Sequence, residues 1–338
     1  MRGNNGSDMA VVGRGAAQAG PAAAAAGARS DGQPAWWRGH ATALFFMAPA
    51  FVMVTLFFLA PVLITLGMSL TDMATATGLS RWQWVGLDNY ERIVRGRFTL
   101  LILGNTLFYV AVTLAFNVLV GLGVALLSTH VEPKAGGLVR SLWLLPRISP
   151  SVVYALMWTW AAADAPFGVI NQLVEPFGVA PRFWLASDPW LIVILINGFV
   201  GASMGMLVFT SAIQSIPEEL FRAARVDGAS AWQIVRRITL PLLKWPILFV
   251  LTYQTMSLFA SYEYILLTTN GGPGLYGTEV WSLWAFHTAL SSYYGNLEFG
   301  FGSALAAVLV VMGLAISFVL LRVFRFNDLV AEPRIEIT

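Results

Sequence analysis

Cysteine and charge are the two features that this 338-residue chain has least of. It contains no cysteine, which excludes disulfides and thiolate metal sites. Charged residues make up 11% of the chain, whereas an average soluble domain has about 25%. The hydrophobic fraction is 57% and the mean hydropathy is +0.69. Such a chain cannot cover a water-facing surface, so we predict that the lipid bilayer is its main solvent.

Lysine and histidine are also scarce. A P-loop needs Gly-x-x-x-x-Gly-Lys-Ser/Thr, and neither Lys134 nor Lys244 fits that pattern. The three histidines, His40, His130 and His287, have no metalloprotease spacing, and no Ser/His/Asp set is visible. We therefore predict that the chain is not an enzyme and holds no cofactor or metal. Its net charge of +2 gives no indication of nucleic-acid binding.

Six apolar runs are each long enough to cross roughly 30 Å of hydrocarbon as a helix, at 42–70, 99–128, 141–163, 189–214, 245–267 and 300–323. An isolated strand cannot satisfy its backbone in lipid, so an all-α membrane protein with six spans is predicted. The preceding residues 1–40 are rich in Ala and Gly, and we expect a disordered tail without an assigned role. The membrane domain is expected over 41–325, and a second tail over 326–338.

The placement of the basic residues predicts the orientation. With the N-terminus inside, fourteen of the 20 Lys and Arg residues fall in cytoplasmic segments and five in external ones, while Arg147 lies within the third run. The positive-inside rule therefore favours cytoplasmic N and C termini.

The polar segment 215–246 lies between two apolar runs, on the predicted cytoplasmic side. Ser215 with Glu218, and Ser230 with Gln233, have capping-box spacing, so two short helices are predicted. Asp227-Gly228 separates them, and Pro241 is expected to end the second. One alternative is a structural hairpin that packs on its own membrane helices. A DNA-binding helix-turn-helix would need a helix free to enter a groove, and this pair is tethered to the bilayer at both ends.

The spacing of this segment also resembles a known family. The segment contains Ala223-Ala224, then Gly228 after three residues, then Ile238-Thr-Leu240-Pro241 after nine more. This pattern resembles the EAA loop of ABC importer permeases. Arg222 stands where that family has Glu, although two glutamates lie one turn earlier. The resemblance implies that the loop docks on an ATPase subunit, through Glu218, Glu219, Arg222, Ala223, Ala224, Asp227, Gly228, Leu240 and Pro241.

Further motifs resemble the sugar, polyol and glycerol-phosphate branch of these permeases, over about residues 42–325. They are Gly86-Leu-Asp-Asn-Tyr90, Leu144-Leu-Pro146, Gly168-Val-Ile-Asn171 and Thr269-Asn-Gly-Gly-Pro273. The resemblance implies the type I importer fold in a bacterial inner membrane. It also implies a second similar permease, two copies of an ATPase that bind ATP and Mg²⁺, and a periplasmic solute-binding protein.

Two polar stripes follow helical spacing inside predicted spans. The stripe in the second run repeats every four residues and consists of Asn105, Tyr109, Thr113 and Asn117. The stripe in the fifth run has the same spacing and consists of Tyr253, Ser257 and Ser261. Two further polar residues at membrane depth are Asn197 and Gln254. Because polar groups in lipid are costly, these residues should face a cavity or another helix. They suit a path for a neutral polyhydroxyl solute, and interhelical hydrogen bonding is the open alternative. Glycines at 119–123 and 198–205 indicate close helix packing.

Two other functions remain open. A secondary, ion-coupled transporter of a small polar solute usually has buried acidic residues, and these spans are nearly free of them, with Glu263 at an outer end. An intramembrane enzyme would need paired catalytic residues at membrane depth, and none is visible.

Overall fold

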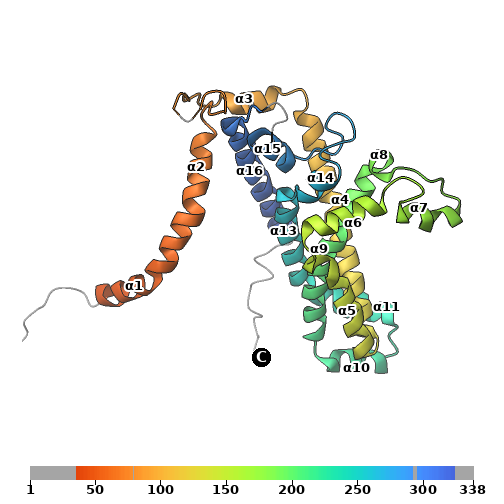
Figure 1. The fold of residues 1–338 in the computed structure, drawn as a ribbon. Coiled ribbons are helices and arrows are strands. Elements are labelled where there is room, and N and C mark those ends of the chain that lie inside the picture. Colours follow the sequence, from red (N-terminus) through yellow and green to blue (C-terminus); the bar gives the residue numbers. More distant parts are fainter. Residues whose placement is uncertain (1–35, 79, 292–294, 324–338) are drawn as a thin grey trace, which may run out of the picture. The chain divides into compact units, whose positions relative to one another are not determined.

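The computed structural model describes residues 36–78, 80–291 and 295–323, and within these ranges its regular elements are helices (Figure 1). A single isolated bridge pairs Thr71 with Trp84. The chain divides into two units, Met1–Phe58 and Leu59–Thr338. The described part of the first unit consists of α1 (Trp36–Val54) and most of a π-helical turn (Thr55–Leu59). The predicted all-α class is confirmed.

Helix α1 begins within the segment that was expected to be a tail. It starts at Trp36, five residues before the predicted domain boundary, so the boundary at residue 40 is wrong in this respect. Residues 1–35 of the predicted N-terminal tail, and the whole predicted C-terminal tail at 326–338, lie outside the described residues.

Among the described residues, four helical stretches are long and apolar enough to cross a membrane, and they match the first, second, fourth and sixth predicted runs. They are Ala43–Met68, which ends in α2 (Ala60–Met68), then α4 (Thr99–His130), α9 (Pro189–Gln214) and α16 (Phe299–Val323). The bounds of the last three differ from the predicted runs by only a few residues.

The third and fifth runs are each broken into two helices, so the prediction of one continuous helix is wrong there. The third consists of α5 (Pro133–Ile148) and α6 (Ser151–Ala161), and the fifth of α13 (Lys244–Ala260) and α14 (Glu263–Thr268). Ser149 is extended, with ψ 141°, because the ring of Pro150 disfavours helical backbone in the preceding residue. Ser261 is extended as well, with ψ 114°.

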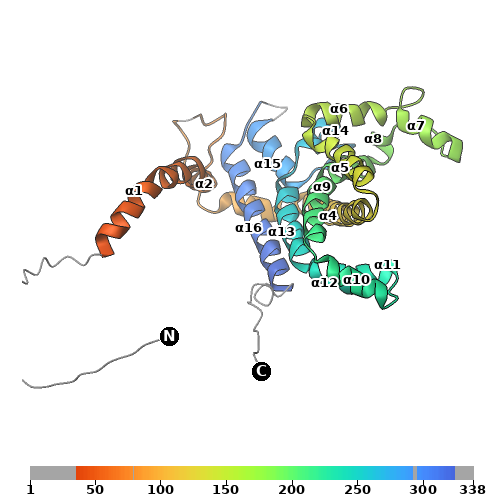
Figure 2. The same cartoon turned by 90° about the horizontal axis from the view of Figure 1, so that it is seen from below.

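Helices α4 and α9 form the most extensive helix-to-helix contact, and α13 packs against both of them (Figure 2). Glycine permits this close approach. A Cβ placed on Gly121 would lie 2.8 Å from the carbonyl oxygen of Ala202, and one on Gly201 would overlap the Asn117 amide. Small residues bring helix backbones together in lipid, where no hydrophobic force drives association. The packing role predicted for the glycines at 119–123 and 198–205 is confirmed for Gly121, Gly198, Gly201 and Gly205, and is wrong for Gly123, where an added Cβ would meet nothing within 4 Å.

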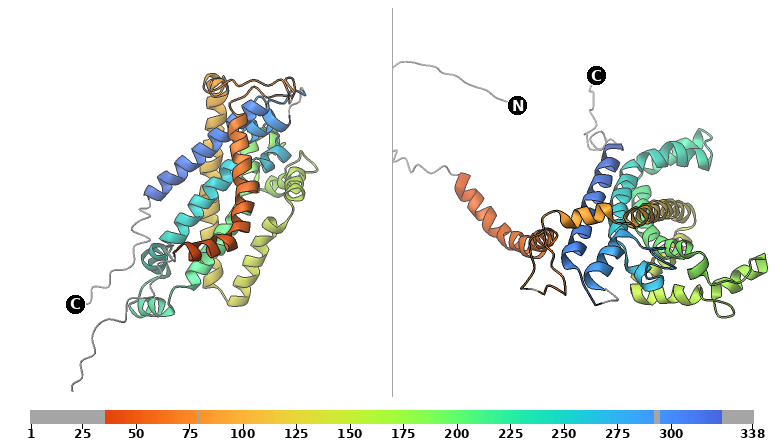
Figure 3. Two further views of the ribbon diagram at one scale, coloured as in Figure 1. Left: turned by 90° about the vertical axis from the view of Figure 1, so that its left-hand side faces the viewer. Right: turned by 90° about the horizontal axis from the view of Figure 1, so that it is seen from above.

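Short elements lie at the two ends of the long helices of the second unit (Figures 1 and 3). At one end are α3 (Asp88–Arg95) and α15 (Trp281–Leu290), and α7 (Val169–Val174), a 3-10 turn (Glu175–Phe177) and α8 (Trp184–Ser187) connect α6 to α9. At the other end are α10 (Glu218–Val226), α11 (Ala231–Ile234), a π turn (Val235–Thr239) and α12 (Leu240–Leu242). The predicted polar hairpin therefore stands directly between α9 and α13.

Candidate functional site

The hairpin turn at Gly228 has the geometry that its sequence predicts. Gly228 has φ +76°, a conformation that costs L residues energy and glycine very little. Its N–H donates to the Arg225 carbonyl at 3.1 Å, and the Ala229 N–H donates to the Ala224 carbonyl at 2.9 Å. This pair of bonds is a Schellman motif, which satisfies the last carbonyls of α10 and reverses the chain.

The two expected capping boxes have different outcomes. The Ser230 hydroxyl accepts from the Gln233 N–H, and the Gln233 side chain accepts from the Ser230 N–H at 2.7 Å, so the second box is confirmed. The first is wrong: Ser215 closes α9, and its hydroxyl donates to the Ala212 carbonyl at 2.8 Å. Pro217 occupies the N-cap of α10 without a side-chain cap.

Pro241 does not end the second part of the hairpin, contrary to the prediction. The π turn over Val235–Thr239 leads into α12, in which Pro241 occupies a first-turn position. A first-turn residue needs no intrahelical N–H bond, so proline is tolerated there. The helical backbone is interrupted only at Leu243, after which α13 begins.

Two exposed ion pairs link side chains of α10. Arg222 pairs with Glu219 at 3.2 Å, and Arg225 pairs with Glu218 at 2.5 Å. Arg222, the residue that departs from the family pattern, thus neutralises a glutamate one turn earlier. Ala223 is exposed and Ala224 half-buried, so this face of α10 is shallow and accessible.

Three large apolar side chains of the hairpin are exposed to solvent. The exposed fractions are 44% for Leu220, 88% for Val226 and 67% for Trp232. Ile234, at 8%, and Leu243, at 0%, are buried, and a cavity of about 660 Å³ separates the hairpin from the ends of α4 and α9. A hairpin that served only to pack on its own helices would bury these side chains, so the surface is suited to a partner.

The polar stripe of the second run lies in the interior of the second unit. Tyr109 is fully buried, and its hydroxyl accepts from the Asn197 amide at 2.7 Å and lies 3.3 Å from the Ser261 hydroxyl. Asn197 also donates to Ser261 at 2.9 Å. These bonds tie α4 and α9 to the break between α13 and α14.

A second group of bonds lies deeper along the same interface. Gln254, which is 4% exposed, donates to the Gly201 carbonyl at 2.7 Å. The Asn117 amide bonds Gln254 at 3.3 Å in one orientation, and in the other it donates to the Gly198 and Thr113 carbonyls. Asn117 and Thr113 are both fully buried. In this conformation Asn117 and Gln254 are interhelical hydrogen-bond partners, which was the alternative left open by the sequence. The Thr113 hydroxyl is buried and has no hydrogen-bond partner among the described residues.

The remaining stripe residues lie elsewhere. Asn105 donates to the Tyr276 and Glu279 carbonyls, at 2.9 and 3.1 Å, and so ties α4 to the loop before α15. Tyr253 is 46% exposed and Ser257 is exposed, so both lie on the outer face of α13. The two stripes therefore do not face each other across a cavity within this chain; only Ser261 meets the α4 stripe.

One polar contact that the sequence did not suggest joins the two broken spans. Helices α6 and α14 pack against each other, and the Ser151 hydroxyl donates to the Glu263 carboxylate. Glu263 is exposed at the first turn of α14, next to the break at Ser261. Ser257 and Glu263 are therefore exposed polar residues on either side of this break, in α13 and α14.

Comparisons with known proteins agree on one family. Residues 117–328 match the family described as the binding-protein-dependent transport system inner membrane component. The chain is 29% identical, over 82% of its length and 92% of the relative's, to the trehalose/maltose transport system permease protein MalF of Thermococcus litoralis. It is 29% identical to the alpha-glucoside transport system permease protein AglF of Rhizobium meliloti, over 79% and 77% of the two chains.

A solved structure has the same fold. It is a bacterial alginate ABC transporter in complex with an alginate pentasaccharide-bound periplasmic protein, and one of its chains is similar with a TM-score of 0.72. The match covers 87% of this chain and 98% of that one, at 23% identity.

Proposed function

Because the chain belongs to the family of binding-protein-dependent transport system inner membrane components, we propose that it forms one half of the solute path of an ATP-driven importer of a neutral, carbohydrate-like solute. It is a multi-pass membrane protein with the type I importer permease fold, and a transport subunit rather than an enzyme. The second half of the path comes from another permease of the same family.

The solute is a sugar, a polyol or a glycerol derivative. The names of two relatives specify trehalose, maltose and alpha-glucosides, which supports a carbohydrate here. Within this chain, Tyr253, Ser257 and Glu263 offer hydroxyl and carboxylate groups on the exposed face of α13 and α14. The buried residues Tyr109, Asn117, Asn197 and Gln254 stand behind that face and hold it in place. We assign the path to the exposed group and the supporting role to the buried one.

The hairpin is the ATPase dock, and the single observation that carries this assignment is its exposed apolar surface. Leu220, Val226 and Trp232 lie on a polar segment that is tethered to membrane helices at both ends. Two copies of an ABC ATPase, which bind the ATP and Mg²⁺, are the proposed partners of this chain and of the second permease. A periplasmic solute-binding protein delivers the solute at the opposite end.

The hairpin is well placed to transmit movement. Only three residues separate the end of α9 from α10, and only Leu243 separates α12 from α13. A displacement of the hairpin on ATPase closure is therefore passed directly to two helices of the core. Rocking of these helices would alternate the path between its two openings.

The proposed orientation places both termini and the hairpin in the cytoplasm of a bacterial cell, with the chain in the inner membrane. The excess of basic residues in the segments on the hairpin side supports it. A secondary transporter remains the competing function, and dependence of uptake on ATP distinguishes the two.

The test is a Gly228→Val variant in proteoliposomes that contain both permeases, the ATPase and the binding protein. The left-handed conformation costs a β-branched residue on the order of 1–2 kcal/mol, so the turn should distort. We expect normal membrane insertion and loss of binding-protein-stimulated ATP hydrolysis and of sugar uptake. Gly178→Val is the matched control, because Gly178 has φ +82° in the connection between α6 and α9. Normal uptake by the Gly228 variant, or equal loss in both, would contradict the proposal.

A further inference from the structure

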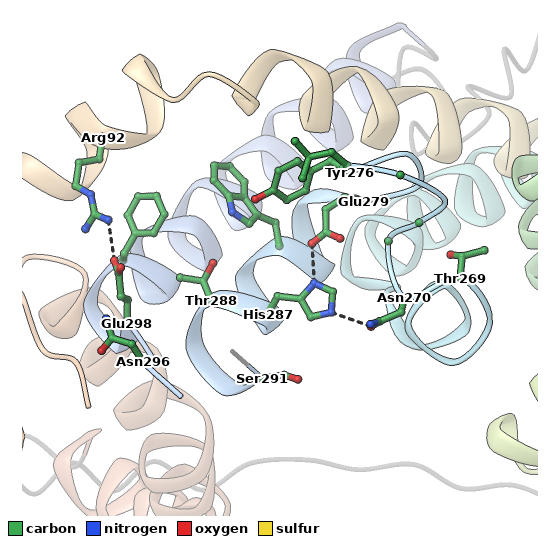
Figure 4. A pocket seen from close by; sticks show the side chains of 16 residues that line it. Arg92, Thr269, Asn270, Tyr276, Glu279, His287, Thr288, Ser291, Asn296 and Glu298 are labelled. Atoms are coloured by element: carbon green, nitrogen blue, oxygen red, sulfur yellow. Dashed lines mark hydrogen bonds and ion pairs between the residues drawn. The ribbon is translucent and has the colours of Figure 1, made fainter. Parts of the chain in front are cut away.

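A cavity of about 510 Å³ opens at the end of the second unit opposite the hairpin (Figure 4). Its walls come from α3, the loop at 269–279, α15 and the start of α16. The volume lies within the range of small-molecule sites, about 300–1,000 Å³. The hairpin and the hydrogen bonds among Tyr109, Asn197 and Gln254 lie away from this cavity, so the function proposed above leaves it unexplained.

The charges around the cavity are paired with one another. Glu279, whose side chain is 3% exposed, bonds His287 Nδ1 at 2.9 Å, and His287 Nε2 lies 3.1 Å from the Asn270 amide oxygen. Across the cavity, Arg92 pairs with Glu298 at 2.7 Å. Figure 4 shows these two pairs on opposite sides. Arg92 has its counter-charge in Glu298, and the Glu279 carboxylate is hydrogen-bonded to His287. Because these groups already have partners within the protein, the cavity suits a neutral polar ligand better than an ion.

Aromatic rings supply the apolar part of the wall. Tyr276, Trp284 and Phe301 all line the cavity and are half-buried, and Trp284 meets Phe301 edge-to-face with ring centroids 5.8 Å apart. The Thr288 hydroxyl lies between the Arg92–Glu298 pair and His287 in Figure 4. Apolar surface beside a few convergent polar groups is the usual composition of a small-molecule site. A sugar ring presents the same combination, with hydroxyl groups around its edge and C–H groups on its faces.

The loop that forms one wall is held rigidly. Asn270 and Tyr276 have φ of +49° and +58°, conformations that cost non-glycine residues energy and persist only when their surroundings fix them. Gly271, with φ +80°, leaves room for the Glu279 carboxylate, which a Cβ would overlap. From below, Asn105 donates to the carbonyls of Tyr276 and Glu279. The wall is therefore fixed before any ligand arrives, which lowers the cost of binding.

We propose that this cavity is an outer subsite for one sugar ring, or one polyol, of the transported solute. The inference rests on the proposed carbohydrate function. The Asn270 amide and the Thr288 hydroxyl would bond the hydroxyl groups, His287 would hold Asn270 in place, and Trp284 would cover a ring face. The subsite would hold the solute at the external end of the chain before it enters the path along α13.

The experiment uses the full chain in lipid nanodiscs, without partners, titrated with trehalose, maltose and glycerol and observed by saturation-transfer NMR. At least one of the three should bind. Thr288→Phe, which fills the cavity, should weaken binding at least tenfold. Thr288→Val removes only the hydroxyl and should weaken it roughly two- to tenfold, as expected for one hydrogen bond. Ala180→Phe, an exposed position in the connection between α6 and α9, is the control and should bind normally.

Two results would overturn the subsite: no saturation transfer to any of the three compounds, or equal binding by the wild type and Thr288→Phe. A variant that binds sugar normally but loses binding-protein-stimulated ATP hydrolysis would also overturn it, because the cavity would then receive a segment of the binding protein. ATP-driven sugar uptake in the reconstituted transporter separates the two proposals. If the wild-type transporter takes up sugar and the Thr288→Phe chain binds sugar as well as the wild type, only the subsite is refuted. If the wild-type transporter takes up no sugar, the proposed function is refuted.

Discussion

Single polar residues inside the membrane helices hold this protein together by reaching specific partners. Asn197 bonds both Tyr109 and Ser261, and Gln254 bonds the carbonyl of Gly201. In lipid an unpaired amide would cost several kcal/mol, so each of these residues fixes the position of its neighbours. Glycine is needed at the same interface, because a Cβ on Gly201 would overlap the Asn117 amide.

At this scale we predict that Gly201→Ala destabilises the chain. The added methyl group would overlap the Asn117 amide, and overpacking of this kind typically costs about 1–3 kcal/mol. The thermal unfolding temperature in detergent should fall. Gly104→Ala is the matched control, because Gly104 also lies in a long helix and its added Cβ would meet nothing within 4 Å. That change should leave the melting temperature the same or raise it; a similar loss in both variants would refute the packing argument.

Elements with the same sequence signature behave differently when their surroundings differ. Ser215 and Ser230 both begin a capping-box pattern, but Ser215 is still part of the last turn of α9. Its hydroxyl is used by its own helix, whereas Ser230 follows a turn, has extended backbone and caps α11. A local motif thus needs a free helix start, and the preceding element decides whether one exists.

We therefore expect Ser230→Ala and Ser215→Ala to differ. Loss of an N-cap costs about 0.5–2 kcal/mol, so Ser230→Ala should loosen α11 and speed amide hydrogen exchange over 231–235. Coupled ATP hydrolysis should fall with it. Ser215→Ala removes no cap and should leave exchange in α10 unchanged. Faster exchange in α10 after the Ser215 change would show that the sequence pattern, and not the observed geometry, was correct.

At the scale of the whole molecule, the second unit carries two distinct surfaces at opposite ends of its long helices. The hairpin exposes apolar and basic side chains at one end, and the cavity at 269–301 has paired charges and aromatic walls at the other. Helices α4, α9 and α13 connect the ends, and their buried amides make the connection stiff. In a membrane, the two surfaces would face different compartments.

Cysteine labelling tests this arrangement directly, because the chain has no cysteine of its own. Single cysteines at Ser230 and Leu275 occupy exposed positions, and Leu275 is 69% exposed. A membrane-impermeant maleimide added to intact cells should label the Leu275→Cys variant, and it should label Ser230→Cys only after the membrane is opened. Labelling of both positions from the same side would refute the proposed topology.

The sequence by itself determined the properties that depend on local chemistry. Composition specified a membrane protein, the apolar runs located four long helices, and Asp227-Gly228 located the turn. These features follow from short-range rules. The length of an apolar run is compared with the thickness of the bilayer, and glycine adopts positive φ at little cost. The spacing from Ala223 to Pro241 also indicated the family, since that surface is built from one continuous segment.

Only the tertiary structure decided what depends on neighbours distant in sequence. Four-residue spacing placed Asn105, Tyr109, Thr113 and Asn117 on one face of α4, but whether that face met solute or protein depended on α9 and α13. The breaks at Ser149 and Ser261, and the bond from Ser151 to Glu263, likewise need the packing of α6 on α14. The cavity likewise brings Arg92 of α3 together with Glu279 and His287. No local pattern predicts it, because burial and contacts between distant residues are properties of the folded chain.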